Sequence, residues 1–304
     1  MITFIDDHRT RWGVEPIRRV LPIAPSTYYA AKKRSPAQRT LRDEYLKVHI
    51  ERAWKENFKV YGADKIWVAL NREKIKVVRC SVERLMRHMG IRGARRGRKV
   101  FTTTTADDVT ARPADLVQRQ FSAPAPNRLW LCDITYVRTW SGTVYVSLVI
   151  DVFARMIVGW QASRSLRTDL CLDALEQAIW ARKDEGLEDL IHHSDRGSQY
   201  LSIRYTERLA EAGGVQSVGS RGDSFDNALA ESVIGLFKTE LIYRQGPWRG
   251  IDDVEFGSLE WVDWWNNRRL LEPIGMVPPA EAEALYYSQR ELVEETGTQG
   301  TESL

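Results

Sequence analysis

Two runs near the middle of the chain decide its fold: His192-His193-Ser194-Asp195-Arg196-Gly197-Ser198-Gln199-Tyr200 and Asp226-Asn227-Ala228-Leu229-Ala230-Glu231-Ser232. Asp195 comes shortly after the apolar pair Leu190-Ile191 and two residues before Gly197, which predicts a carboxylate at the end of a buried strand. Glu231 lies among apolar residues that recur at steps of three and four, which predicts a helix over 227–243. The two acids have 35 residues between them.

A third carboxylate lies upstream, in Trp130-Leu131-Cys132-Asp133-Ile134-Thr135-Tyr136-Val137. A strand that is apolar on both faces is usually buried on both faces. A lone ionised aspartate there costs several kcal/mol unless it is paired or binds a metal. We therefore expect Asp133, Asp195 and Glu231 to form one site. Because its donors are oxygens, the site suits a hard cation, Mg²⁺ or Mn²⁺. Two such ions ~3.5–4 Å apart can activate one oxygen and stabilise the other in phosphodiester chemistry.

These motifs resemble the D,D-35-E catalytic triad of retroviral-integrase-like transposases. More narrowly, they resemble the OrfB product of the IS-three family of insertion sequences, as does the later Trp265-Asn266-x-x-Arg269. The resemblance covers residues 14–287 and rests on three separate motifs at compatible spacings. It implies that Asp133, Asp195 and Glu231 are the catalytic residues and bind two metal ions.

The resemblance also implies a fold, an activity and partners. The fold class would be α/β, a ribonuclease-H-like integrase core preceded by a basic, all-α helix-turn-helix region. The activity would be Mg²⁺-dependent cleavage and strand transfer at the ends of an insertion sequence. Partners would be double-stranded DNA, further copies of the chain on that DNA, and an upstream-frame OrfA product or a frameshift fusion with it. The place would be the bacterial cytoplasm.

Composition agrees with a soluble DNA-binding protein. No run approaches 18 apolar residues, and the three cysteines have no metal-binding or disulfide spacing. Residues 1–112 carry 26 Lys and Arg against 12 Asp and Glu, whereas the rest carries 18 against 29. A basic arm on an acidic body predicts a polyanionic partner for the arm. The alternative is an ordinary solvated charged surface.

The arm contains two helical patterns that end in a basic tail. Residues 14–34 predict two short helices around a turn. Farther on, Asp64 and Ser81 are candidate caps for a helix-turn-helix pair, whose second helix can enter a major groove. Outward arginines on that helix and in the tail are candidate DNA contacts: Arg79, Arg84, Arg87, Arg92, Arg95, Arg96, Arg98 and Lys99. A helical packing module with a solvated charge run remains the alternative.

The predicted domains follow these patterns. They are a small helical segment at 1–40, a helix-turn-helix region with its basic tail at 41–100, and a linker at 101–126 rich in threonine and proline. The integrase core spans 127–287 and a polar, frayed tail spans 288–304. Within the core we expect three antiparallel strands, then helix, strand, helix, strand and the helix that bears Glu231. Periodicity alone supports only a mixed α/β fold.

Several side chains beside the carboxylates invite a role. Lys238 is seven residues after Glu231 and so on nearly the same helix face, where it can reach a phosphate; a structural ion pair is the alternative. His193, Gln199 and Asn227 are candidates to orient the metal ligands. Three further acids have ordinary explanations: Asp151 as a turn residue, and Asp223 and Asp226 as helix caps. Glu240 would face away from Glu231. Trp261 and Trp265 are expected to pack in the core rather than stack on a base.

Two other functions compete with transposition. A DNA-binding regulator without catalysis would use the basic arm alone, but an intact triad argues against it. A nuclease would cut without joining, and strand-transfer product separates it from a transposase.

Overall fold

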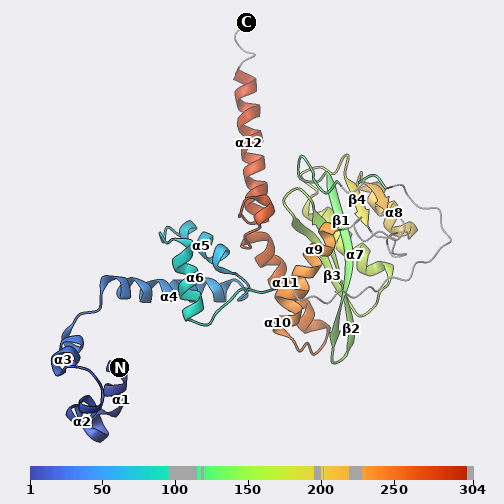
Figure 1. The fold of residues 1–304 in the computed structure, drawn as a ribbon. Coiled ribbons are helices and arrows are strands. Elements are labelled where there is room, and N and C mark those ends of the chain that lie inside the picture. The colour runs from blue at the N-terminus through green and yellow to red at the C-terminus, as the bar shows by residue number, and fades with distance from the viewer. Residues whose placement is uncertain (96–114, 118–119, 195–199, 201, 219–227, 300–304) are drawn as a thin grey trace. The chain divides into compact units, whose positions relative to one another are not determined.

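The computed structural model describes residues 1–95, 115–117, 120–194, 200, 202–218 and 228–299 (Figure 1). The chain divides into two compact units, Met1–Glu51 and Arg52–Leu304, and helix α4 (Gln38–Glu56) crosses the division. Among the residues described, no helix combines the length and the apolar character needed to span a membrane.

The first unit is a small helical cluster. It contains α1 (Ile2–Trp12), α2 (Val14–Val20) and α3 (Pro25–Lys33), and its core is Ile5, Ile17 and Tyr28. The Tyr28 hydroxyl donates a 2.9 Å hydrogen bond to Asp6, which ties α3 to α1. The sequence predicted two helices within 14–34, and both are present; α1 was not predicted.

The helix-turn-helix pair opens the second unit. Helix α5 (Ala63–Arg72) buries Ile66 and Leu70, and α6 (Arg79–His88) buries Val82, Leu85 and Met86. The predicted caps are wrong, because α5 begins after Gly62 and α6 begins after Val78. The Asp64 carboxylate instead accepts a hydrogen bond from Arg79, so it joins the two helices rather than capping one.

The core is a five-stranded sheet with the order β3-β2-β1-β4-β5. Its strands are β1 (Leu129–Thr139), β2 (Gly142–Asp151), β3 (Met156–Ser163), β4 (Ile191–Ser194) and β5 (Val215–Val218). The first three pair antiparallel, and β4 and β5 run parallel to β1. With α7 (Thr168–Ala181), α8 (Ile203–Glu211) and α9 (Ala228–Phe237), this order confirms the predicted integrase-type core.

The central position of β1 decides the setting of Asp133. Both backbone edges of β1 are paired, with β2 on one side and β4 on the other.

Helix α7 packs on β3 and β2, and its close approach depends on Gly159. A Cβ atom at that position would lie 2.1 Å from the Ala174 carbonyl oxygen, so no larger residue fits without moving the helix.

The helix that bears Glu231 is not continuous to Tyr243, contrary to the prediction. Helix α9 ends at Phe237, a π-helical turn (η2) follows over Lys238–Ile242, and α10 spans Tyr243–Gln245. A π turn admits one extra residue and shifts every side chain after it around the axis. Glu240 lies in this turn and is buried.

The C-terminal elements are α11 (Ile251–Asn267), η3 (Glu272–Ile274) and α12 (Pro279–Gln299). Trp261 and Trp265 on α11 are 0% and 1% exposed, which confirms that they pack in the core. The prediction of a frayed tail from residue 288 differs from the structure, because α12 continues to Gln299. Its Ala, Glu, Leu, Gln and Arg residues are strong helix formers, and no proline follows the first turn.

Candidate active site

Asp133 lies half-buried near the middle of β1, opposite Leu148 of β2. Its Oδ1 atom accepts a 2.8 Å hydrogen bond from the Ile134 backbone N–H. On the other edge of β1, Cys132 pairs with Ser194, the last residue of β4. The register therefore leads β4 alongside Asp133 and reaches the residue that precedes Asp195. Asp195 itself lies outside the described residues.

Glu231 lies in the first turn of α9, which packs against β1. The Glu231 side chain is exposed. Five apolar residues of α9 are buried: Leu229, Ala230, Val233, Ile234 and Phe237. Partial burial raises the pKa of Glu231. A carboxylate in this setting suits a bound cation.

Lys238 lies near enough to Asp133 for their charges to interact. Its Nζ atom is 4.8 Å from the centroid of the Tyr136 ring, within the range of a cation–π contact. Burial lowers the pKa of Lys238, and the nearby Asp133 charge partly opposes that shift. Tyr136 belongs to the sequence motif around Asp133, but the motif gave no signal that its ring would contact a lysine from the distant helix.

Two neighbouring histidines on β4 point to opposite faces of the sheet. The buried His193 bonds through Nδ1 to Ser217 Oγ of β5 at 2.9 Å and lies 3.9 Å from Asp115 Oδ1. Ser217 Oγ also accepts a 2.9 Å hydrogen bond from the Leu116 N–H. His193 thus joins β4, β5 and the segment 115–117. The other two residues predicted to orient the ligands, Gln199 and Asn227, lie outside the described residues.

His192 is a core residue rather than a ligand. Its Nε2 atom is 2.9 Å from the Tyr205 hydroxyl, and the side chain is fully buried. Burial lowers the pKa of His192 to about 4, so the ring is neutral at pH 7. Tyr200, the residue after the Asp195–Gln199 stretch, is also buried, and its hydroxyl accepts a 3.4 Å hydrogen bond from the Sγ–H of Cys132, the neighbour of Asp133.

Asp151 is not the turn residue that the sequence suggested. It ends β2 with its side chain completely buried. Its carboxylate accepts hydrogen bonds from the N–H groups of Asn127 (2.6 Å) and Phe153 (2.9 Å) and from Trp130 Nε1 (3.3 Å). Burial raises its pKa, and these bonds oppose the shift. Asp151 anchors the sheet, while the predicted caps Asp223 and Asp226 lie outside the described residues.

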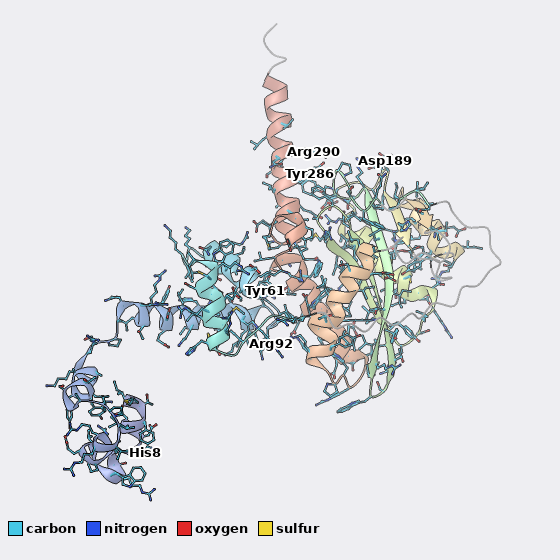
Figure 2. All side chains as sticks on the ribbon, viewed as in Figure 1. His8, Tyr61, Arg92, Asp189, Tyr286 and Arg290 are labelled. Atoms are coloured by element: carbon cyan, nitrogen blue, oxygen red, sulfur yellow. The ribbon has the colours of Figure 1, made fainter. Side chains whose placement is uncertain are left out.

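The candidate DNA contacts of the arm are exposed where the structure describes them. They are Arg79, Arg84 and Arg87 on α6, and Arg92 (Figure 2) and Arg95 after it. Arg79 pairs with Asp64 and Glu83, and Arg87 pairs with Glu83 at 3.2 Å, which reduces the positive charge of this face. Arg96, Arg98 and Lys99 lie outside the described residues. Contact with DNA stays a prediction for all eight.

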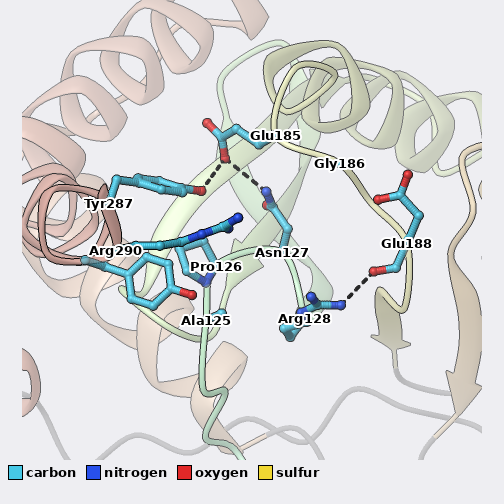
Figure 3. Close-up of a pocket in the computed structure, with 10 residues that line it drawn as sticks. Ala125, Pro126, Asn127, Arg128, Glu185, Gly186, Glu188, Tyr287 and Arg290 are labelled. Carbon is cyan, nitrogen blue, oxygen red and sulfur yellow. Dashed lines mark hydrogen bonds between the residues drawn. The ribbon is translucent and has the colours of Figure 1, made fainter. Parts of the chain in front are cut away.

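A small pocket of about 70 Å³ lies against α12 and contains neither Asp133 nor Glu231 (Figure 3). Glu185 lies in its wall and accepts hydrogen bonds from Tyr287 at 2.8 Å and Asn127 at 3.0 Å. These groups satisfy one another, so we assign the pocket a structural role. Within the described residues, no group of three or more His, Cys, Asp or Glu side chains has metal-binding geometry, and Asp195 is not among them.

The comparisons with protein families agree with this geometry. Residues 123–224 and 214–279 match two family models, each described as an integrase core domain. Residues 40–99 match a model described as an HTH-like domain. Fold and site therefore define an integrase-type enzyme with a helix-turn-helix region before its core.

The relatives narrow this class. The chain is 58% identical over 274 residues to a putative transposase for insertion sequence element IS986/IS6110 of Mycobacterium tuberculosis (strain H37Rv), covering 89% of this chain and 98% of that protein. It is 51% identical over 293 residues to the transposase for IS629 of Shigella sonnei, covering 95% and 97%. A solved HTLV-2 integrase catalytic core domain in complex with magnesium shows 16% identity and a TM-score of 0.42, covering 53% and 98%. The chain belongs to the IS-three family of transposases, DDE-type polynucleotidyl transferases that act in DNA transposition, as its motifs predicted.

Proposed function

We propose that Asp133, Asp195 and Glu231 are the catalytic residues and metal ligands of this transposase. One observation carries the proposal: α9 packs on β1, so that the helix bearing Glu231 lies against the strand bearing Asp133, and Lys238 of the following turn contacts Tyr136 of that strand. The pairing of Cys132 with Ser194 supports the inclusion of Asp195, the next residue in the chain.

The donor set fits Mg²⁺ or Mn²⁺. All three side chains supply oxygen ligands, which these hard cations prefer. Burial raises the pKa of Glu231, as expected for a carboxylate that awaits a positive partner. When bound, two ions would activate the attacking oxygen and stabilise the leaving oxygen. The chain supplies the ligands and the cationic Lys238 beside them, and no side chain has to act as a nucleophile.

The DNA partner is assigned to the arm. Helix α6 is the candidate for the major groove, and its exposed Arg84 and Arg87 lie on the side that does not pack on α5. The basic tail adds affinity that depends on salt rather than on sequence. The domain limits at 40, 100, 126 and 287, which derive from the sequence patterns, belong to the same proposal. So do a homo-oligomer on DNA and an OrfA partner, which derive from the family resemblance.

The test is a cleavage and joining assay on labelled insertion-sequence ends, with Mg²⁺ present or absent. We expect the wild type to nick the end and join it, and both products to vanish in Asp133→Asn and Glu231→Gln while DNA binding persists. Glu255→Gln changes an exposed glutamate on α11 and is the matched control. Binding without nicking in every protein would favour a regulator, and nicking without joining would favour a nuclease.

A further inference from the structure

The Trp265-Asn266-x-x-Arg269 motif has a structural role outside the carboxylate site. The Arg269 guanidinium forms two hydrogen bonds to the Glu240 carboxylate, Nε to Oε2 at 3.0 Å and Nη2 to Oε1 at 2.5 Å. Both residues are 4% exposed. The guanidinium also lies 4.6 Å from the centroid of the Trp265 ring. A buried arginine that pairs with a carboxylate through two hydrogen bonds and stacks on an aromatic ring holds that carboxylate in one geometry.

The partner of Arg269 belongs to the catalytic helix. Glu240 lies in the π-helical turn η2, which continues α9 without a break in the chain. Glu240 lies nine residues after Glu231, and Lys238 lies in the same turn. The buried pair with Arg269 therefore anchors the turn that begins where α9 ends.

Asn266 anchors the same motif to the sheet. Its Oδ1 atom accepts a 2.9 Å hydrogen bond from the Ile157 N–H, and its Nδ2 atom donates one of 2.8 Å to the Ile157 carbonyl. Ile157 belongs to β3, the edge strand, so Asn266 completes its backbone pairing as a neighbouring strand would. Arg269 is thus held at a fixed position relative to the sheet.

The helix-turn-helix region reaches the motif through one tyrosine. Tyr61 (Figure 2) precedes α5, and its hydroxyl accepts a 2.7 Å hydrogen bond from the Leu270 N–H and donates one of 3.3 Å to the Arg268 carbonyl. These backbone groups flank Arg269. The Tyr61 side chain is 1% exposed, and its ring lies 6.0 Å from that of Trp264.

A second contact supports the first. Trp264 Nε1 donates a 2.9 Å hydrogen bond to Asn57 Oδ1, and the Phe58 ring lies 4.9 Å from the Trp264 ring. Arg72 of α5 also forms an ion pair with Glu281 of α12, but both side chains are substantially exposed. Such exposed pairs contribute little, so the buried contacts around Trp264 and Tyr61 define the connection.

We infer that Tyr61, Arg269 and Glu240 form a positioning link that sets where a DNA end held by the helix-turn-helix region meets the catalytic helix. Tyr61 holds the backbone on both sides of Arg269, and Arg269 holds the turn that follows Glu231. None of the three is a catalytic residue. The link rests on the proposed function, since it positions DNA only if α5 and α6 bind the end.

The link can be tested without DNA, by amide hydrogen exchange. In the free protein, Tyr61→Phe should loosen η2, although Tyr61 is far from it in sequence. Amide hydrogen exchange over Lys238–Ile242 should become at least about threefold faster, while α8 (Ile203–Glu211) keeps its wild-type rate. Tyr287→Phe removes a hydroxyl that donates to Glu185 instead, and should leave both segments unchanged. Faster exchange confined to residues 268–271 would overturn the link.

The second experiment measures the position at which the protein nicks DNA. Wild type should cut an end-labelled DNA at one phosphodiester. Tyr61→Phe should bind that DNA with wild-type affinity, spread its cuts over neighbouring bonds and join at least about tenfold less, because small misplacements cost large factors in rate. Asn57→Ala, which removes the acceptor for Trp264, should shift both readouts in the same direction and serves if Tyr61→Phe unfolds.

The two failures can be told apart. Wild-type protein that does not bind end DNA would overturn the proposed function, and the exchange experiment would still decide whether the link exists. A Tyr61→Phe protein that binds, cuts at the wild-type position and joins at the wild-type rate would overturn the link alone. A loss of binding and joining in equal measure would show an ordinary structural contact, and would also overturn it.

Discussion

The Nζ atom of Lys238 lies 4.8 Å from the centroid of the Tyr136 ring, three residues along β1 from Asp133. This contact joins η2, which continues the helix that bears Glu231, to β1, so that the Lys238 charge and the Asp133 carboxylate interact. Burial lowers the pKa of Lys238 and Asp133 partly opposes the shift, so the ammonium group depends on nearby negative charge. A DNA phosphate would supply more of it.

Lys238→Met should reduce strand transfer roughly tenfold to a hundredfold, because the variant keeps the apolar stem and loses the charge beside the reacting phosphate. Lys238→Arg should retain part of the activity. Single-turnover joining at saturating DNA separates this effect from weaker binding. Full activity in Lys238→Met would mean that the lysine only packs on Tyr136.

His192 predicts a loss of stability in mild acid. Its pKa is about 4 in the folded chain and about 6.5 when unfolded. Between these values the unfolded state binds a proton that the folded state does not, so stability is full above pH 6.5 and falls as the pH drops toward 4. The loss is on the order of 3 kcal/mol.

Urea unfolding between pH 4 and 7 measures this loss. His192→Gln should flatten the dependence, and His88→Gln, at an exposed histidine, should leave it as in the wild type. An identical pH profile in His192→Gln and wild type would show that other groups govern the acid transition.

A buried ion pair ties α12 to Arg182, the residue that follows α7. Arg182 Nη2 lies 2.7 Å from Glu283 Oε1, with side chains 6% and 7% exposed. Removing one partner strands a buried charge, so Arg182→Met should cost about 3–5 kcal/mol of unfolding free energy. The double variant Arg182→Met with Glu283→Leu should recover much of that loss, since apolar replacement of a whole pair is often neutral.

Denaturant unfolding of the two single variants and the double variant gives the coupling energy. If the double variant loses the sum of the two single losses, the pair contributes no interaction of its own.

The sequence was informative where local pattern and chemistry coincide. Periodicity along the core predicted a mixed α/β fold, the residues around Asp133 and Glu231 predicted a strand and a helix, and the family resemblance implied the integrase-type order. It was uninformative where tertiary contacts decide. The role of Glu240 could not be assigned, because its partner Arg269 lies in the segment after α11, 29 residues farther along the chain.

The predictions for Asp151 and Asp64 were wrong for the same reason, because tertiary contacts decide where each carboxylate bonds. Asp151 follows an apolar run and precedes a turn, a position in which an exposed aspartate is common. Only the three-dimensional structure shows that Asn127 and Trp130 lie beside Asp151 and donate hydrogen bonds to its buried carboxylate. Likewise, Asp64 suits a cap by sequence, but Arg79 competes successfully for its carboxylate.

The central claim is that Asp133 and Glu231 bind the catalytic metal, and metal-specific rescue tests it most directly. A thiolate is a poor ligand for Mg²⁺ and a better one for softer ions such as Mn²⁺. Asp133→Cys and Glu231→Cys should therefore bind end DNA, fail to nick it with Mg²⁺ and regain nicking with Mn²⁺. Folded, DNA-binding cysteine variants that are equally active with both ions, or equally inactive with both while the wild type uses either, would contradict the account.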